Sequence, residues 1–495
     1  MALVDRIARG VKASFGATLL DLASNALLVL VLTRVLFTPA EYGQLNFALS
    51  ALGVITVLAT LGLPRSAARY VTEFTETDPG QVPYVIRRSA LFLTAMVALV
   101  AAGTVVLGPA VVRLSNSLGV TDSPAVGGLL AVGGVYVAGR ASQSYLTTIF
   151  QGLNRVDWSA TVTAITSISR LPLVVGLVTL GFGVAGAVAG YVLALALASL
   201  VGAYVLYTRF YRDYDAASTA ADRLTRRLLE YSVPLTATRG ANVLDKKVDT
   251  LLIGVLVDMT AVGYYTVAKQ ISDFVAAPAS SFGYTISPAL AEQTSRDRAE
   301  RAATLYRRSL EYVLLGYVPA LVGLVLVAEP TIRYVFGPDY LGSVLVLQVF
   351  CGFMLVNAIN KVTSDGLDYL GRARSRAIVK SATAVGNFGL NLLLIPQYGA
   401  VGAAAATVVT YTVYTGSNVY VITQELPVNL RSIGRLLGIV ALITVGMAAV
   451  VAGALPYVSD LPSLLAVVAL GGGMWAALSV LGGVLDVKRV VSLLT

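Results

Sequence analysis

The feature that most constrains this chain is a succession of apolar stretches, each long enough to cross a lipid bilayer. These stretches recur from Ser14 to Leu485 with only short polar segments between them. An α-helix rises about 1.5 Å per residue, so roughly 20 residues cross the hydrocarbon core. The polar segments are too short to hold a separate soluble domain. We therefore predict an all-α integral membrane protein with about fourteen transmembrane helices.

The predicted spans follow from hydropathy, which defines their ends only to within a few residues. They are residues 14–36, 44–63, 88–112, 125–150, 159–180, 184–207, 231–257, 262–286, 311–328, 343–365, 376–395, 400–422, 434–455 and 461–485. The first apolar run is too long for a signal peptide and lacks a small-residue cleavage site, which predicts a retained first helix. We predict an N-lobe at 1–207, a cytoplasmic linker at 208–230, a C-lobe at 231–422 and two further spans within 434–495.

The basic residues are unevenly distributed between the two sides of the predicted membrane. The chain has 36 Lys and Arg against 27 Asp and Glu, an excess that could also indicate a nucleic-acid partner. With a cytoplasmic N-terminus, about 26 of the 36 basic residues fall in cytoplasmic segments. The outer loops hold only Arg113 and Arg333. This distribution is typical of the positive-inside rule and not of a nucleic-acid patch, so we predict a multi-pass protein of the cytoplasmic membrane with both termini cytoplasmic.

Histidine and cysteine, which often bind metals or act in catalysis, are scarce in this chain. The chain contains no histidine and one cysteine, Cys351. Histidine is the commonest metal ligand and the usual proton shuttle near neutral pH, and one cysteine cannot form an intrachain disulfide. We expect no metal site, no catalytic residues and no cofactor, beyond a coupling H⁺ or Na⁺.

An internal repeat relates two parts of the chain. The segment GLNRVDW from Gly152, a span and then GFGVAGAVAG recur from Gly366 as GLDYLGRARSRA, a span and then QYGAVGAAAA. Gly183 and Gly186 match Gly399 and Gly402. Chance similarity among Gly- and Ala-rich segments is the alternative. Because six helices is an even number, the repeat predicts two six-helix lobes related by an axis along the membrane normal, plus two C-terminal helices.

Eight basic residues fall inside predicted spans. They are Arg34, Arg140, Arg170, Arg239, Lys246, Lys247, Lys269 and Lys361. A charge at the bilayer centre costs on the order of 2.5 to 3.5 kcal/mol, so these side chains must face protein or water. Arg34 is the exception, since it lies near the outer end of its helix and can extend to the interface.

Polar residues share helix faces with several of these cations. In the seventh span, Arg239, Asn242, Lys246 and Asp249 fall within an arc of roughly 80°, with Lys247 on the far side. This pattern favours a hydrated, net-positive cavity between the lobes, suited to a phosphate or pyrophosphate headgroup that carries sugars. The expected substrate-binding residues are Arg140, Gln143, Arg170, Arg239, Asn242, Lys246, Lys269 and Lys361. Local neutralisation, such as Lys269 with Asp273, is an open alternative.

Carboxylates inside the spans are candidates for ion coupling. In the first span, Asp21 shares a face with Ser14, Thr18 and Asn25, and could bind a small cation or a proton. The alternative for Asp21 is an interhelical hydrogen bond or an ion pair with a basic residue of another span. The full set of expected ion-coupling residues is Asp21, Asn25, Asp249 and Asp273.

Proline within a span breaks helical hydrogen bonding, as expected at Pro172, Pro278 and Pro319. Pro278 lies among small residues in the segment AAPASS, which favours it as the hinge of a conformational change. A packing kink is the alternative.

Three segments carry a resemblance to a known family. They are LTRVLFTPAEYGQLNFALS from Leu32, VDTLLIGVLVDMTAVGYYTVAKQIS from Val248 and YVFGPDYLGSVLVLQVF from Tyr334. Together with the twelve-plus-two spans, they resemble the polysaccharide and oligosaccharide flippases of the multidrug, oligosaccharidyl-lipid and polysaccharide exporter superfamily. The resemblance implies alternating access, with an undecaprenyl- or dolichyl-type tail left in the bilayer while the sugar headgroup crosses. It also implies membrane lipids and glycan-assembly enzymes as partners.

Three other functions remain open. A multidrug antiporter or a peptidoglycan-precursor flippase would have the same fold, although a pump for organic cations would favour an acidic cavity. A membrane-embedded glycosyltransferase or polysaccharide ligase would need catalytic carboxylates on the outer face. The longest outer loops, 113–124 and 329–342, offer no such set. We therefore expect a transporter that carries lipid-linked oligosaccharide to the outer leaflet for surface polysaccharide or protein glycosylation.

Overall fold

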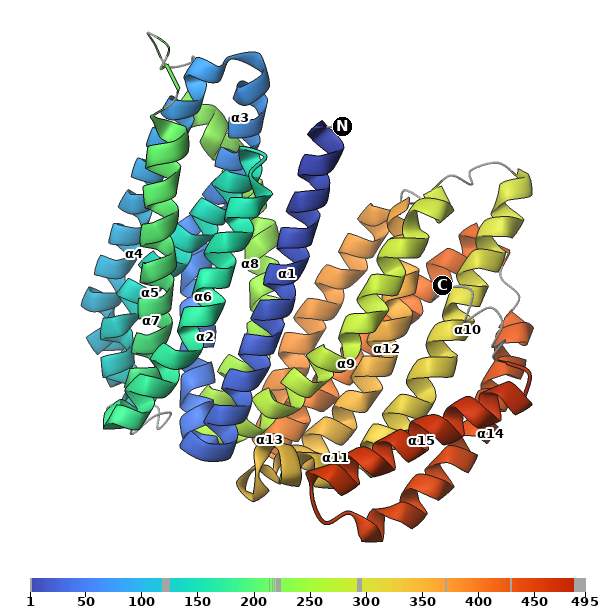
Figure 1. The fold of residues 1–495 in the computed structure, drawn as a ribbon. Coiled ribbons are helices and arrows are strands. Elements are labelled where there is room, and N and C mark those ends of the chain that lie inside the picture. Colours follow the sequence, from blue (N-terminus) through green and yellow to red (C-terminus); the bar gives the residue numbers. More distant parts are fainter. Residues whose placement is uncertain are drawn as a thin grey trace. The chain divides into compact units, whose positions relative to one another are not determined.

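The computed structural model describes residues 2–117, 125–212, 214–215, 217, 219, 224–291, 296–369, 372–427 and 430–484. Within these ranges every regular element is a helix, which confirms the predicted all-α class (Figure 1). The chain forms two compact units, Met1–Thr260 and Ala261–Thr495.

The first unit is built around one central helix. Its helices are α1 (Ala2–Val31), α2 (Pro39–Thr60), α3 (Leu63–Thr77), α4 (Val82–Ser117), α5 (Ala125–Gly152), α6 (Val156–Leu177), α7 (Gly183–Leu206) and α8 (Leu224–Leu256). Helix α5 packs against α2, α3, α4, α6 and α7, while α1 packs against α6. Side chains that project from different faces of α5 can therefore reach most of this unit.

The second unit pairs α12 with α13. Its helices are α9 (Met259–Ala291), α10 (Arg296–Leu326), α11 (Ala328–Thr331), α12 (Ser343–Tyr369), α13 (Ala373–Glu425), α14 (Leu430–Ala454) and α15 (Leu461–Leu481). Helix α10 packs against both α12 and α14, and α14 packs against α15. The indole N–H of Trp475 donates to the carbonyl of Leu315 over 3.0 Å and ties α15 to α10. The last two spans therefore attach to this unit through α10.

The division between the units falls later than the end of the predicted N-lobe. Helix α8, the predicted seventh span, packs against α2 and α3 and belongs to the first unit. The preceding linker also contacts this unit, because the amide of Ala217 donates to the carbonyl of Gly80 over 3.0 Å and the Tyr84 hydroxyl donates to the carbonyl of Ala217 over 3.0 Å. The predicted lobe boundaries at 207 and 231 remain predictions about the transport cycle.

The helices account for the fourteen predicted spans. Among the described residues, nine helical stretches are long and apolar enough to cross a membrane. Two of these, Val156–Tyr211 and Arg374–Glu425, have 56 and 52 residues, which at about 1.5 Å per residue is far more than one crossing needs. Each holds two predicted spans. Helices α5, α8 and α9 occupy the other three predicted spans.

Helix starts in this chain follow ordinary capping chemistry. Thr38 caps α2 in a reciprocal capping box with Glu41, and Pro39 takes the first helical position. Asp460 caps α15 in the same way with Ser463. The side-chain and backbone hydrogen bonds from Ser463 hold the pKa of the Asp460 carboxyl below its ordinary value.

The internal repeat has a counterpart in backbone geometry. Gly183 between α6 and α7 has φ 51° and ψ −138°, and its repeat partner Gly399 inside α13 has φ 56° and ψ −135°. Only glycine adopts this conformation readily. A methyl group on Gly186 would lie 2.6 Å from Cβ of Phe182, and one on Gly402 would lie 2.6 Å from the carbonyl carbon of Leu394. Both copies therefore place a bend and a close backbone approach at matching residues, which is not expected of chance similarity.

The close approach at Gly402 predicts a selective loss of stability. Gly402→Ala would press the new methyl group against the Leu394 carbonyl across the bend, at a cost of about 1–3 kcal/mol. Gly416→Ala is the matched control, because it lies in the same helix with no atom within 4 Å of its Cβ. Thermal unfolding of the purified protein in detergent should show a lowered Tm for Gly402→Ala alone. Equal Tm values for the two variants would contradict the close approach.

Candidate functional site

A cavity of about 640 Å³ lies within the first unit. Five helices contribute to it, α1, α2, α5, α6 and α8. Its charged lining residues are Asp21, Arg140, Arg170, Arg239 and Lys247. Four cations against one carboxylate give this wall a net positive formal charge. A net-positive, partly hydrated wall stabilises anions.

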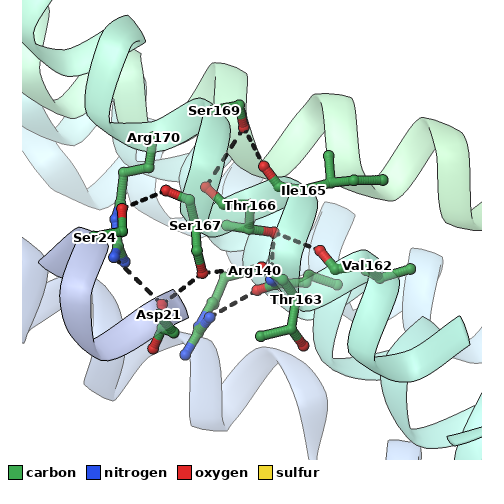
Figure 2. A network of polar contacts seen from close by, with 11 residues as sticks. Asp21, Ser24, Arg140, Val162, Thr163, Ile165, Thr166, Ser167, Ser169 and Arg170 are labelled. Atoms are coloured by element: carbon green, nitrogen blue, oxygen red, sulfur yellow. Dashed lines mark hydrogen bonds and ion pairs between the residues drawn. The ribbon is translucent and has the colours of Figure 1, made fainter. Parts of the chain in front are cut away.

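Arg140 is held at the cavity wall by a polar relay between α5 and α6. Its Nη1 donates to Oε1 of Gln143 over 2.7 Å, and Nε2 of Gln143 donates to the hydroxyl of Thr166 over 2.6 Å (Figure 2). Gln143 and Thr166 are both buried, whereas Arg140 is exposed to the cavity. A guanidinium has five N–H donors. The relay uses one of them in the described part of the chain, so the others can bind a ligand.

A second polar cluster joins α1 to α6 around Asp21. Oδ1 of Asp21 accepts a hydrogen bond from the Ser167 hydroxyl over 2.7 Å and lies 3.3 Å from Nη2 of Arg170 (Figure 2). The Arg170 side chain is 14% exposed and that of Asp21 is 46% exposed. Asp21 is therefore the counter-charge of a mostly buried arginine. An ion pair with a basic residue of another span was the alternative predicted for Asp21.

Arg170 has donor capacity that Asp21 does not use. Its Nε is buried without a hydrogen-bond partner among the described atoms. The guanidinium carbon lies 5.7 Å from the ring centroid of Tyr191. An unpartnered buried N–H costs about 1–3 kcal/mol, so a ligand oxygen that reaches it would gain that amount.

The face of α1 at this site differs from the predicted one. Asn25 is exposed and does not line the cavity, whereas the Ser24 hydroxyl donates to the carbonyl of Ser167 over 2.5 Å. Buried Ala17 and Leu28 lie on the same side as Asp21 and Ser24. The contact face therefore follows positions 17, 21, 24 and 28, and a role for Asn25 beside Asp21 in ion coupling remains a prediction.

The face of α8 toward the cavity also differs from the prediction. Arg239, Val243 and Lys247 line the cavity at successive intervals of four residues. Asn242 and Lys246 are exposed and lie outside the lining, and Asp249 is buried. Lys247, expected on the far side of the polar stripe, lines this cavity. Polar residues surround this helix, so helical spacing alone could not identify the face that meets α2.

Hydroxyl groups on α2 complete the wall and were missing from the predicted site. Thr56 and Thr60 line the cavity and donate to carbonyls of their own helix, Thr56 to Leu52 over 2.7 Å and Thr60 to Thr56 over 3.0 Å. Their oxygens can still accept hydrogen bonds from a ligand. The small and polar positions 53, 56 and 60 form a helical stripe, which is the pattern that could have identified them.

Three predicted site residues lie in the second unit. Lys269 lies with its Nζ 5.5 Å from the ring centroid of Tyr265, Asp273 is exposed and Lys361 is half-buried. None of them lines the cavity of the first unit. Helix α9 continues through position 278, but the side chain of Pro278 lies outside the described residues, so the hinge remains a prediction.

The second unit has polar contacts of its own, one between α12 and α13 and two between the parts of α13 on either side of Gly399. The Asn418 amide donates to Oδ1 of Asn360 over 2.9 Å, and the Asn387 amide donates to the Thr410 hydroxyl over 3.2 Å. Lys380 lies 4.8 Å from the ring centroid of Tyr411. These contacts satisfy polar groups between helices, and the described residues place no carboxylate-rich cluster with them that could hold a metal ion.

The family model for polysaccharide biosynthesis proteins matches residues 8–293, which is more than half of the chain. The chain belongs to this family. The match covers the first unit from residue 8 onward, including the cavity, and extends through α9 of the second. The predicted recognition of a polysaccharide flippase family is therefore confirmed.

Two curated relatives of this polysaccharide biosynthesis protein come from Haloferax volcanii. The probable flippase AglR is 24% identical over 423 residues, which covers 82% of this chain and 81% of AglR. The probable low-salt glycan biosynthesis flippase Agl15 is 24% identical over 167 residues, which covers 34% of this chain. The chain thus spans only 35% of the length of Agl15 in that match.

A solved structure shows the same fold. The lipid II flippase MurJ, in an inward closed conformation, matches with a TM-score of 0.71 at 16% identity, covering 95% of this chain and 97% of MurJ. This confirms the predicted two-lobe transporter fold for the polysaccharide biosynthesis protein. At this identity, the likeness is one of fold.

Proposed function

We propose that this protein is an alternating-access flippase for a lipid-linked oligosaccharide. It moves a polyprenyl- or dolichyl-(pyro)phosphate-linked glycan from the cytoplasmic to the outer leaflet of the cell membrane, for surface polysaccharide or protein glycosylation. Family membership and the glycan flippases among its relatives support a flippase-like role in glycan biosynthesis. The observation that carries the choice of cargo is the net-positive cavity.

The arginines of the cavity suit a phosphate group. Arg140 and Arg170 come from adjacent helices, and each keeps N–H donors that no described residue occupies. Guanidinium groups bind phosphate oxygens through paired, charge-assisted hydrogen bonds. We assign the phosphate or pyrophosphate of the cargo to this pair, with Arg239 and Lys247 as further positive charge. Sugar hydroxyls would donate to threonine oxygens on α2.

The ion pair in the cavity gives a route for coupling. A phosphate oxygen accepts from the same N–H groups as Asp21, so cargo and Asp21 compete for Arg170. The displaced carboxylate would be free to take H⁺ or Na⁺. We assign the coupling site to Asp21 on this ground. Asp249 and Asp273 remain further candidates from the sequence.

The alternative functions differ from this proposal in the kind of cargo or chemistry that the protein should support. A multidrug antiporter for organic cations would be repelled by four cations around one carboxylate. A peptidoglycan-precursor flippase carries the same pyrophosphate chemistry, and its cargo differs in the sugars and peptide. A glycosyltransferase or ligase would need a catalytic set outside the membrane, and the relatives named above are transporters.

Reconstitution into liposomes tests the proposal. A fluorescent polyprenyl-pyrophosphate disaccharide is placed in both leaflets, and a membrane-impermeant quencher then reports the share that reaches the outer leaflet. The protein should increase quenching of this lipid but leave fluorescent phosphatidylcholine protected. Efflux of ethidium without movement of the glycolipid would instead identify a multidrug transporter.

A further inference from the structure

A second cavity, of about 660 Å³, lies in the first unit among α4, α5 and α7. Its wall is largely apolar and includes Leu91, Leu93, Leu146 and Leu200. Leu91 and Leu200 are 59% and 71% exposed, so the space opens at the surface of the unit. We name this feature the α4–α7 groove.

The groove and the cationic cavity lie on opposite faces of α5. The cavity is lined by Arg140, Gln143 and Thr147, and the groove by Ser142, Tyr145 and Leu146. At about 100° per residue, these two sets point roughly 140° apart. A molecule held in the cavity therefore cannot extend its tail into the groove without passing through α5.

Several polar groups in the wall of the groove are already hydrogen-bonded within the protein. The Tyr145 hydroxyl donates to the carbonyl of Ile86 over 2.9 Å and lies 2.8 Å from the hydroxyl of Ser89. The Ser199 hydroxyl donates to the carbonyl of Gly139 over 3.4 Å. The wall thus offers carbon surface and few free donors, which suits a hydrocarbon chain.

The groove is about as deep as one leaflet. Its lining runs from Ser199 in α7 to Tyr211 in the π-helical turn that follows, about 18 Å at roughly 1.5 Å per residue, and from Arg87 to Thr94 along α4, about 10 Å. One leaflet contributes half of a hydrocarbon core that is roughly 30 Å thick. The groove therefore matches a single lipid chain that starts at the headgroup level.

One end of the groove carries the groups that meet lipid headgroups. Arg87 is exposed there, and no carboxylate in the described part of the chain pairs with it. Tyr207 and Tyr211 stack beside it with centroids 5.9 Å apart and an interplanar angle of 22°. Tyrosine is enriched at the membrane interface, and basic groups on the cytoplasmic side of membrane helices bind anionic lipid. The distribution of basic residues predicts that this end is cytoplasmic.

We propose that the α4–α7 groove binds an anionic phospholipid of the cytoplasmic leaflet. The lipid phosphate contacts Arg87, its headgroup lies beside Tyr207 and Tyr211, and one hydrocarbon chain follows α4 and α7 past Leu91. The occupant is a resident membrane lipid and not the transported glycolipid, because α5 separates the groove from the cavity. The inference does not depend on the identity of the cargo.

Native mass spectrometry of the full chain tests this site. The protein is placed in nanodiscs of phosphatidylcholine with a minority of phosphatidylglycerol, released gently, and analysed for retained lipid. Arg87→Gln should lower retention of phosphatidylglycerol about fivefold, whereas Arg88→Gln, which is also exposed but lies outside the groove, should not. Leu91→Trp fills the groove and should also lower retention. Leu99→Trp, at a lipid-exposed position elsewhere on α4, is its control.

Three results would overturn the proposal. The first is equal retention of phosphatidylglycerol by Arg87→Gln and Arg88→Gln. The second is retention of phosphatidylcholine equal to that of phosphatidylglycerol. The third is crosslinking of a photoactivatable polyprenyl phosphate to α4 and α7 in competition with phosphatidylglycerol. Unchanged elution on size exclusion shows that each variant is folded. Glycolipid movement in the liposome assay is measured separately, so loss of this lipid site and loss of the proposed flippase activity remain distinguishable.

Discussion

Arg170→Gln is expected to lower the initial rate of glycolipid movement at least tenfold at subsaturating substrate. The variant loses charge-assisted hydrogen bonds to phosphate, each worth about 1.5–3 kcal/mol, and about 1.4 kcal/mol corresponds to a tenfold change. It also leaves the Asp21 carboxylate without its counter-charge in a cavity that binds an anion. The liposome assay measures the rate directly.

The double variant separates these two effects. Asp21→Asn combined with Arg170→Gln removes the unpaired carboxylate, so it should be faster than Arg170→Gln alone. Arg34→Gln is the control, because Arg34 is exposed and lies outside the cavity lining. A rate for Arg170→Gln within twofold of the wild type would remove Arg170 from the proposed phosphate site.

Two adjacent lysines on α8 give the second large expected effect. Lys247→Glu reverses a charge in the cavity wall and should reduce glycolipid movement by more than tenfold, since the cavity then holds two carboxylates against three cations. Lys246→Glu changes the overall charge of the protein equally at an exposed position outside the lining. Its rate should stay within about threefold of the wild type. The variants are compared in the same liposomes at equal protein density.

The opposite order of these rates would favour the face predicted from the sequence. In that case Arg239, Asn242 and Lys246 would form the binding surface, and the cavity of the first unit would not be the headgroup site. A matching loss in both variants would indicate a general effect of charge on α8. Salt screens charges among packed helices only weakly. If the lost rate arises at such a site, raised ionic strength should not restore the rate of glycolipid movement in either variant.

The fold could be predicted from the sequence to a considerable depth. The lengths of the apolar stretches predicted the fourteen spans, because the thickness of the bilayer sets how many residues a helix needs to cross it. The Gly183 and Gly399 match identified the two bends, since only glycine adopts φ near +55° with ψ near −137° at low cost. The six-helix repeat predicted the two-lobe arrangement, which the MurJ structure supports.

The candidate site could be predicted only in part. Arg140, Gln143, Arg170 and Arg239 were identified because an arginine or a buried amide inside an apolar span needs a partner or water. Lys247 and the hydroxyls of α2 were missed. A helix such as α8, with charge on several faces, has no single polar stripe for helical spacing to reveal.

Contacts between distant helices were beyond the reach of the sequence alone. Asp21 and Arg170 are separated by 149 positions, and nothing in either segment indicates that α1 packs against α6. Helical spacing describes one helix at a time, whereas the counter-charge of a buried group depends on its neighbour. The same reason explains why Asn25 was preferred to Ser24 on α1.

The most direct test of the central claim is the sidedness of lipid-linked oligosaccharide in cells that lack this protein. The completed glycolipid should accumulate on the cytoplasmic leaflet, and the wild-type chain should restore it to the outer leaflet while Arg170→Gln should not. Normal sidedness and normal surface glycans in the deletion strain, together with altered tolerance to cationic drugs, would contradict a flippase and favour multidrug export on the same fold.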